Sequence, residues 1–376
     1  MNKNIINSKI VLFLGAGASA FLDKPLMVEF VDDLIKHLDK VAPDLSSLAR
    51  TIIEAKGKDL EVLLNELDSI SQRSYFKGEE KRNYFKDRFD APENPYIGLG
   101  IVPYSGSAKE LPNRSKFGKE YERLCKLCDQ LKWHIYDKIF EKYYSIEELK
   151  VISLYDPLIN TIKKSLNPAK RIIPVFTTNY DKAIEKYCET QQSLHLVDGF
   201  QYDIKKKFER WEITNFEKFK PKKNHLNLCL FKLHGSIFWY RVDSKIIYSP
   251  ISTQNPSDAR IEPVLLFPSK DKDYALNFDP FITAYSYLQR CFDNSKLIIF
   301  IGYSFRDHIS ITFLKSALRF NDKLKVMVID PNATKLKEQH FSFYSKRFIC
   351  IDKPFTNNKD DYLEELEKSL SELKNT

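Results

Sequence analysis

The sequence predicts an α/β fold built on a doubly wound, mostly parallel sheet. Two uninterrupted apolar runs, residues 297–301 and 326–329, indicate strands that are buried on both faces, as in a parallel sheet covered by helices. Helical patterns over residues 279–293 and 307–320 separate several strand patterns, which is typical of βαβ units. A third observation is that the apolar run 10–14 leads directly into a turn of small residues. We therefore expect a Rossmann-like sheet that carries a helical insertion domain.

The turn after this first strand has the spacing of a nucleotide-binding loop. Gly15, Gly17 and Ala20 match the pattern G-x-G-x-x-A. An apolar stretch that begins near Leu26 predicts a helix beyond the turn. Backbone N–H groups and the positive end of a helix would then face a phosphate. An ordinary tight turn, in which small residues serve packing only, matches the same pattern.

The next segment has helical patterns and little sign of strands. The helical patterns cover residues 27–70, 117–149 and 156–165. Between them, the charged residues 73–90 and the Pro- and Gly-containing residues 91–114 predict a long connection. We expect residues 27–167 to form a helical insertion subdomain. Residues 1–26 together with 168–376 would form the Rossmann-like domain.

Strand patterns resume after the insertion. They cover residues 171–178, 228–233, 245–248, 263–267, 296–302, 325–330 and 347–351. A charged helix is expected over residues 360–374, and we find no internal repeat.

Charge and hydropathy narrow the functional classes. The 376 residues include 59 Lys+Arg and 51 Asp+Glu, so the formal net charge is +8. These charges are scattered, which favours a solvated surface over a nucleic-acid face. Residues 205–224 interleave basic and aromatic side chains, as a nucleic-acid face would, but a solvated insertion with interspersed acidic residues would look the same, and we favour it. No apolar run approaches the roughly 18 residues that span a bilayer, so we expect a cytoplasmic protein.

The cysteines do not indicate a zinc site. Cys125 and Cys128 form one CxxC pair, and the other four of the six cysteines stand alone. A structural zinc site needs a second close pair, so we expect reduced thiols and no bound metal.

Four of the expected strands end in clusters of small or polar residues. These clusters are residues 15–19, 177–181, 233–236 and 302–307. In open α/β sheets, ligands bind at the carboxyl ends of the strands, so the four clusters could converge on one crevice.

The ordered series GAGAS, TTNYD, LHGS and GYSF, followed by VIDPN, resembles the sirtuin (silent-information-regulator) superfamily. The resemblance runs from about Ile10 to Asn332 and leaves the helical insertion unmatched. It is closest to the bacterial branch found in anti-phage defence systems. The resemblance implies a Rossmann-like fold and NAD+ as the substrate.

The resemblance also implies roles for individual residues. Those that would contact the cofactor are Gly15, Ala16, Gly17, Ser19, Thr178, Asp181, Gly302, Ser304, Asp330 and Asn332. The first four resemble the loop that holds the pyrophosphate, and Asp330 with Asn332 falls where the adenosine ribose is bound. Asn179 resembles the asparagine beside the nicotinamide ribose, and His234 resembles the histidine general base.

These residue types suit cleavage of a nicotinamide–ribose bond. Nicotinamide leaves as a neutral molecule, so the reaction needs a positioned nucleophile and a base but no general acid. Histidine titrates near neutrality, and the amide of asparagine can orient a hydroxyl or a water without adding charge. By itself, His234 could equally be a strand-end histidine bonded to the backbone; its place before Gly-Ser favours the catalytic interpretation.

Departures from the sirtuin pattern favour hydrolysis of NAD+ over protein deacylation. Deacylating sirtuins carry a four-cysteine zinc module, and this sequence has one CxxC pair. They also hold a peptide in a cleft after the histidine motif, where residues 236–240 do not match. We therefore expect an NAD+ glycohydrolase. An NAD-dependent protein deacylase and a non-catalytic module that senses NAD+ or ADP-ribose are the alternatives.

Depletion of NAD+ would kill the cell if it were constitutive, so the branch resemblance implies a gated anti-phage effector. Members of this branch are gated by oligomerisation, by a fused sensor or by a partner protein. We expect a homo-oligomer, controlled by a HerA-type DNA translocase ATPase or, second, by an Argonaute-type partner. Direct binding of nucleic acid is left open.

Overall fold

The structure is a computed structural model. It describes residues 1–24, 27–58, 60, 62–64, 66–67, 114–168, 171–203, 208–242, 245–249, 261–266 and 278–374. The connection expected over residues 73–114 lies outside the described residues except for Arg114, and residues 204–207 of the basic-aromatic segment lie outside them as well.

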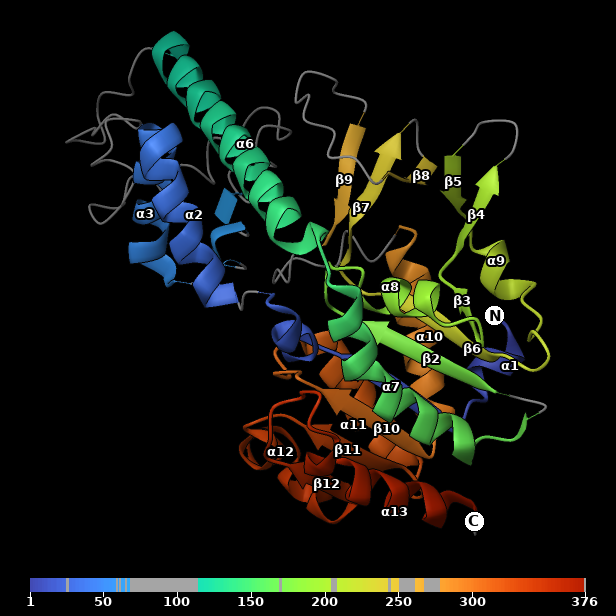
Figure 1. Cartoon of the computed structure of the whole chain (residues 1–376). Coiled ribbons are helices and arrows are strands. Elements are labelled where there is room, and N and C mark those ends of the chain that lie inside the picture. The colour runs from blue at the N-terminus through green and yellow to red at the C-terminus, as the bar shows by residue number, and fades with distance from the viewer. Residues whose placement is uncertain are drawn as a thin grey trace. The chain divides into compact units, whose positions relative to one another are not determined.

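A seven-stranded parallel sheet forms the centre of the fold (Figure 1). Its strands, in spatial order, are β12 (Phe348–Ile351), β11 (Lys325–Ile329), β10 (Leu297–Ile301), β1 (Ile10–Leu14), β2 (Ile172–Thr177), β6 (Leu226–Lys232) and β3 (Leu194–Val197). The chain builds outward from β1 in both directions, so the order reverses between β1 and β10. Such a reversal is where open α/β sheets bind ligands. The predicted doubly wound, mostly parallel sheet is confirmed.

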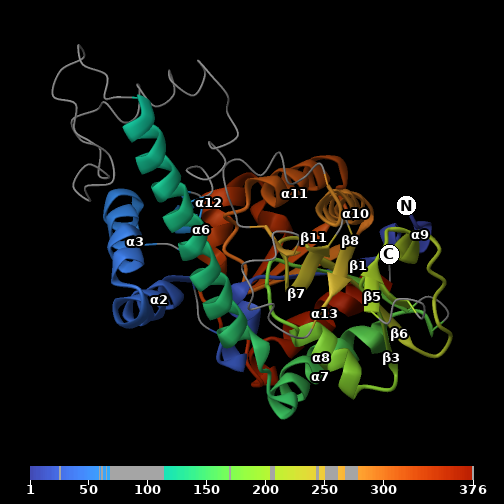
Figure 2. The ribbon, with the colours of Figure 1, turned by 90° about the horizontal axis from the view of Figure 1, so that it is seen from above.

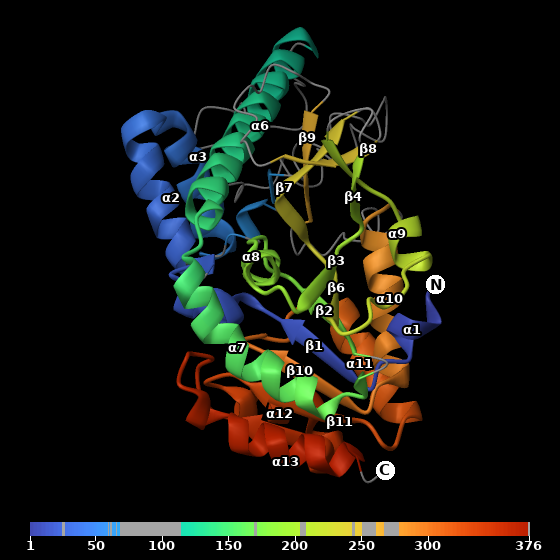
Figure 3. The same ribbon diagram turned by 45° about the vertical axis from the view of Figure 1, so that its right-hand side comes forward.

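Helices cover both faces of this sheet, as Figure 2 shows. On one face, α7 (Glu148–Ser165), α8 (Ala183–Thr190) and α13 (Leu363–Lys374) share a buried core with Leu12, Val175 and Ile299 of the sheet. Helices α7 and α13 run side by side over the strands (Figure 3). The apolar runs that predicted doubly buried strands are therefore explained by helices on both sides.

The opposite face is covered by α10 (Phe281–Asn294) and α11 (His308–Phe320), and its core is aromatic. Phe292 of α10 lies with its ring centroid 6.3 Å from that of Phe13 and 6.5 Å from that of Phe176. Tyr287 stacks on Phe231 of β6 at 4.8 Å. Because side chains alternate along a strand, one helical layer contacts aliphatic residues and the other contacts aromatic ones.

A second sheet consists of five antiparallel strands, two of which precede β6 in the chain and three of which follow it. Its order is β4 (Phe200–Asp203), β5 (Phe208–Trp211), β8 (Lys245–Tyr248), β7 (Gly235–Val242) and β9 (Ile261–Leu265). The strands expected over residues 245–248 and 263–267 belong to this second sheet. The sequence analysis did not anticipate β7, although its residues form a continuous apolar and aromatic run that signals a buried strand.

The remaining helices are α1 (Lys3–Ile6), η1 (Ala16–Leu22), α2 (Met27–Val41), α3 (Pro43–Lys56), α6 (Arg114–Tyr144), α9 (Thr214–Glu217), α12 (Ala333–Phe341), η6 (Ser342–Arg347) and η7 (Lys359–Asp361). None of the described helices is long and apolar enough to cross a bilayer.

The chain divides into two compact units. The first comprises Met1–Lys24, Phe140–Leu266 and Lys272–Thr376, and the second consists mainly of Pro25–Ile139. The sequence analysis placed α7 in the insertion, whereas the contacts group it with the sheet. The domain boundaries themselves stay a prediction.

Candidate functional site

The loop that follows β1 packs backbone to backbone on the loop that follows β10. The Gly15 N–H donates to the carbonyl of Ile301 at 2.9 Å, and the Gly17 N–H donates to the carbonyl of Gly302 at 3.0 Å. A Cβ atom on Gly302 would lie 2.3 Å from the carbonyl carbon of Gly17. Packing at the point where the strand order reverses therefore accounts for these glycines directly.

The expected helix beyond the turn is confirmed as α2, but a 3₁₀ helix lies between the turn and that helix. The turn leads into the 3₁₀ helix η1, which ends at Asp23 in a left-handed conformation, and α2 begins only at Met27. In addition to Gly15 and Gly17, the Ala18 N–H is engaged, with the carbonyl of Gly15 at 3.0 Å. A short 3₁₀ helix offers poorer donor geometry than an α-helix. An anion held here would depend on donors other than these three N–H groups.

The side-chain amide of Asn179 is oriented by the loop after β1. Its Nδ2 donates to the carbonyl of Gly15 at 2.9 Å and to the Ser19 Oγ at 3.0 Å. The Asn179 N–H donates to the Thr177 Oγ1 at 3.0 Å, which in turn donates to the carbonyl of Leu14 at 3.1 Å. Both N–H groups of the amide are thus committed to the protein, which leaves its carbonyl oxygen as the group that a ligand could use.

Asp181 lies two residues further along the same loop and is buried. Its Oδ1 accepts a hydrogen bond from the Ala183 N–H at 2.8 Å, at the start of α8. Within the described part of the chain, its Oδ2 has no hydrogen-bond partner. A buried carboxylate oxygen without a partner costs free energy unless a ligand supplies a donor.

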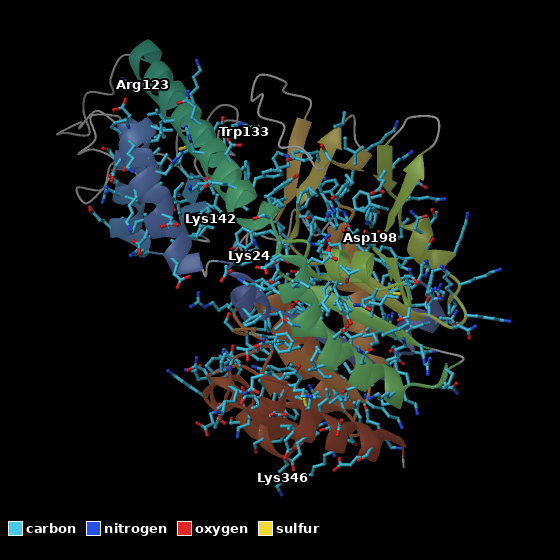
Figure 4. The ribbon with its side chains drawn as sticks, viewed as in Figure 1. Lys24, Arg123, Trp133, Lys142, Asp198 and Lys346 are labelled. Carbon is cyan, nitrogen blue, oxygen red and sulfur yellow. The ribbon has the colours of Figure 1, made fainter. Side chains whose placement is uncertain are left out.

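A buried lysine lies near this carboxylate. Burial lowers the pKa of Lys24, and the negative charge of Asp181 opposes that shift. The Lys24 Nζ donates to the carbonyl of Lys142 at 3.0 Å and to that of Ser145 (Figure 4). Lys24 therefore binds the C-terminal end of α6 and contributes positive charge near Asp181.

His234 lies where the chain passes from β6 of the parallel sheet to β7 of the antiparallel sheet, and it is buried. Its backbone carbonyl accepts a hydrogen bond from the Leu266 N–H at 2.8 Å. Its ring centroid is 6.4 Å from that of Tyr180, the residue that follows Asn179. The Tyr180 carbonyl in turn accepts from the Ser236 Oγ at 3.3 Å. The TTNYD and LHGS segments are therefore neighbours in space.

The residues expected in a late nucleotide-binding loop and at the adenosine ribose lie further along the same edge of the sheet. Ser304 is exposed after β10. Asp330 follows β11, and its Oδ1 accepts from the Asn332 N–H at 2.8 Å; burial raises the pKa of this carboxyl group. Thr178 donates its N–H to the carbonyl of Leu14 at 3.1 Å. Hydrogen bonds thus unite the residues after β1, β2 and β10, whereas Ser304, Asp330 and Asn332 share only the edge.

The described part of the basic-aromatic segment has a structural use. Trp211, Phe216 and Phe219 are buried. The Nδ2 of Asn2 donates to the carbonyl of Phe219 at 2.6 Å and to that of Phe216 at 3.1 Å. These three aromatic rings are not available for stacking on bases.

The cysteines are free thiols. Burial raises the pKa of the Cys128 thiol to about 12, so it is an inert thiol within α6. Among the described residues, no three His, Cys, Asp or Glu side chains come together as a metal site would require.

Sequence reasoning missed three buried polar residues around the site. Tyr155 of α7 donates its hydroxyl to the carbonyl of Ala18 at 3.5 Å. Lys232 forms an ion pair with Glu185 of α8, with its Nζ 3.1 Å from the Glu185 Oε1. A signal existed for Lys232, since it is a charge at the end of a mostly apolar strand and two residues before His234. Lys24 carried no such signal.

The match to a family model supports the expected superfamily. Residues 174–351 match a family model described as a SIR2-like domain. None of the curated proteins compared with the chain matches it. Among solved structures, a Sir2 homologue in complex with NAD is 13% identical, covers 98% of this chain and 93% of its own, and has a TM-score of 0.44. A Sir2 complex with a p53 peptide and NAD+ is 13% identical, covers 96% and 95%, and has a TM-score of 0.38.

Proposed function

Because the chain carries a SIR2-like domain over residues 174–351 and is sirtuin-like there, we propose that it is an NAD+ glycohydrolase. In this proposal the chain cleaves NAD+ into nicotinamide and ADP-ribose. The observation that carries it is the fixed amide of Asn179, which is held by Gly15 and Ser19 and lies on the same loop as the buried Asp181. Rigid placement of a polar group without charge is what an oxocarbenium-like reaction needs in order to orient a ribose hydroxyl or a water.

The proposed reaction is a substitution at the anomeric carbon of the nicotinamide ribose. The bond from this carbon to the nicotinamide nitrogen breaks, and its electron pair stays on the nitrogen, which makes nicotinamide neutral. The oxygen of a water forms the new bond to carbon, and its proton passes to the imidazole of His234. Asn179 accepts a hydrogen bond from the water or a ribose hydroxyl through its free-facing carbonyl oxygen. No step requires a metal ion.

The residues after His234 support hydrolysis over deacylation. They form β7, which pairs with β8 along one edge and with β9 along the other. Ile237 and Phe238 on this strand are buried. A peptide substrate would have to displace one of these neighbouring strands in order to add to β7. A water molecule can react without displacing either strand.

We extend the proposal to the biological role. The chain would act in the cytoplasm as an anti-phage effector that depletes NAD+. Its activity would be gated by self-association or by a partner, with a HerA-type DNA translocase ATPase as the first candidate and an Argonaute-type protein as the second. These partners rest on the branch resemblance described above and on no contact in the structure.

The test is nicotinamide release from NAD+ by the purified chain, alone and with a candidate ATPase, without any acyl peptide. We expect release by the wild type. Asn179→Ala and His234→Ala should each lower it by about 100-fold or more, the usual contribution of a positioned group or a general base. Asn294→Ala, in an exposed position, and His225→Ala, in a partly exposed one, are matched controls and should release nicotinamide at the wild-type rate.

Other outcomes separate the alternatives. Turnover only after an acyl-lysine peptide is added would indicate a deacylase. Tight NAD+ binding with no release under any condition would contradict the hydrolase and indicate a sensing module.

A further inference from the structure

A buried ion pair links the two segments that carry Asn179 and His234. Lys232, the last residue of β6, and Glu185, in the first turn of α8, have side chains that are 1% and 13% exposed. The Lys232 ammonium also donates to the backbone carbonyl of Asp181. One ammonium group thus contacts both the TTNYD loop and the helix that follows it.

The chain positions of these contacts bear on the geometry of the site. Asp181 is two residues after Asn179, and Lys232 is two residues before His234. Thr177 and Lys232 are paired across β2 and β6, and the Leu233 N–H donates to the Thr177 carbonyl at 2.8 Å. The backbone ladder fixes the strands up to this point, and Lys232 extends the connection to the loop beyond them.

Stability alone gives little reason for a buried ion pair here. Removing an ammonium and a carboxylate from water is costly, and a well-packed apolar pair of similar volume is often as stable. Burial raises the pKa of Glu185, and the nearby ammonium of Lys232 only opposes this shift. What an apolar pair could not supply is the hydrogen bond to the Asp181 carbonyl.

We propose that Lys232 is a positioning residue for the reaction: by holding the Asp181 carbonyl, it sets the loop that carries Asn179 relative to His234. This inference rests on the proposed function. It adds a residue that acts through the catalytic groups without touching NAD+.

A double substitution separates positioning from stability. Lys232→Met alone leaves the carboxylate of Glu185 buried without its partner, so it should lower the melting temperature and the activity together. Lys232→Met with Glu185→Met replaces both charges, and we expect it to restore the melting temperature. The kcat for nicotinamide release should nevertheless fall by about 100-fold, while KM stays within about threefold, because a displaced catalytic group affects the reaction more than binding.

A second readout does not depend on catalysis. Hydrogen exchange of the backbone amides of residues 178–183 should be at least about tenfold faster in the double variant, because the loop loses a donor. Lys325→Met removes an exposed lysine that is paired with Glu372, and it should change neither readout. If the wild type releases no nicotinamide, the proposed function fails. Hydrogen exchange alone then tests whether Lys232 holds the loop of residues 178–183. Wild-type kcat in the folded double variant, or wild-type exchange in both variants, would overturn the inference.

Discussion

At the scale of single residues, the amide of Asn179 decides how the site can be used. Its two N–H groups are bonded to Gly15 and Ser19. In the proposed site, a ligand would therefore meet an acceptor there and not a donor, which suits a hydroxyl or a water. Ser19 itself is buried, and its hydroxyl faces the Asn179 amide. The sequence analysis had assigned Ser19 to the phosphate loop; that role stays a prediction, and the hydrogen bond to Asn179 adds an orienting one.

A second residue gives a prediction about pH. Burial and the negative charges of Glu185 and Glu209 raise the pKa of the Asp198 carboxyl group from 3.8 to about 7. Between about pH 4 and pH 7 the folded protein keeps a proton that the unfolded chain has lost. The free energy of unfolding should therefore fall as the pH rises through this range. Asp198→Asn removes this titration, so the variant should gain stability over the wild type from about pH 4 to pH 7.

Urea unfolding at several pH values measures this gain. The difference in the free energy of unfolding between Asp198→Asn and the wild type should grow by at most about 1.4 kcal/mol per pH unit. The actual value should be smaller, because the Asp198 side chain is only half-buried. The Phe200 N–H, which donates to the Asp198 Oδ1 at 3.0 Å, can bond the asparagine oxygen as well. The exposed Asp322→Asn serves as the control. Parallel stability curves for Asp198→Asn and the wild type would refute the prediction.

At the scale of elements, the contact between the loops after β1 and β10 limits which side chains each loop can accommodate. Gly302 has a φ of +58°, and a side chain there would meet the backbone of Gly17 and Ala18. We expect Gly302→Ala to lower the free energy of unfolding by about 1–3 kcal/mol and to reduce nicotinamide release at least about tenfold, because the loop that orients Asn179 must move.

The control for this substitution is Gly57→Ala. Gly57 also has a positive φ, +112°, but nothing lies within 4 Å of an added Cβ atom. The variant should lose a similar amount of stability through backbone strain alone and keep its activity. Thermal unfolding and the release assay together distinguish the two effects, and equal activity of both variants would show that the loop contact does not matter for the site.

The elements that could be predicted are those with long apolar signals. The strands β1, β10 and β11 contain uninterrupted apolar runs, and the structure confirms them in a parallel sheet. The short strands β4 and β5 have four residues each and little periodicity, so the second sheet went unrecognised. The 3₁₀ helix after Gly15 was missed for another reason, since propensity does not separate it from the start of an α-helix.

At the scale of the whole molecule, every residue proposed to hold the nucleotide belongs to the first compact unit. We expect ADP-ribose, the proposed product, to stabilise this unit on binding. At 100 times its Kd the gain is about 2.7 kcal/mol. Hydrogen exchange should slow in the segments around residues 15–19 and 177–181 and stay unchanged in α2 and α3. Protection confined to α2 and α3 would show that the nucleotide binds elsewhere.

The same scale shows why the site was only partly predictable. The four motif clusters could be expected at one edge because parallel strands place their carboxyl ends together. The role of the buried Lys24 could not be predicted from the sequence. Its hydrogen bonds go to the carbonyls of Lys142 and Ser145, more than 100 residues away in the chain. Such contacts join residues that are far apart in the sequence, and a local sequence pattern does not predict them.

The hydrogen bonds of Lys24 have an evolutionary consequence. Lys24 is the last residue before the second unit begins, and Lys142 lies just after the chain has come back. The two chain positions that flank the second unit are therefore joined by hydrogen bonds within the first unit. The hydrogen bonds hold these two chain positions together without involving the residues between them. The segment between them, Pro25–Ile139, can therefore change in length or in sequence. We expect related proteins to differ most in that segment.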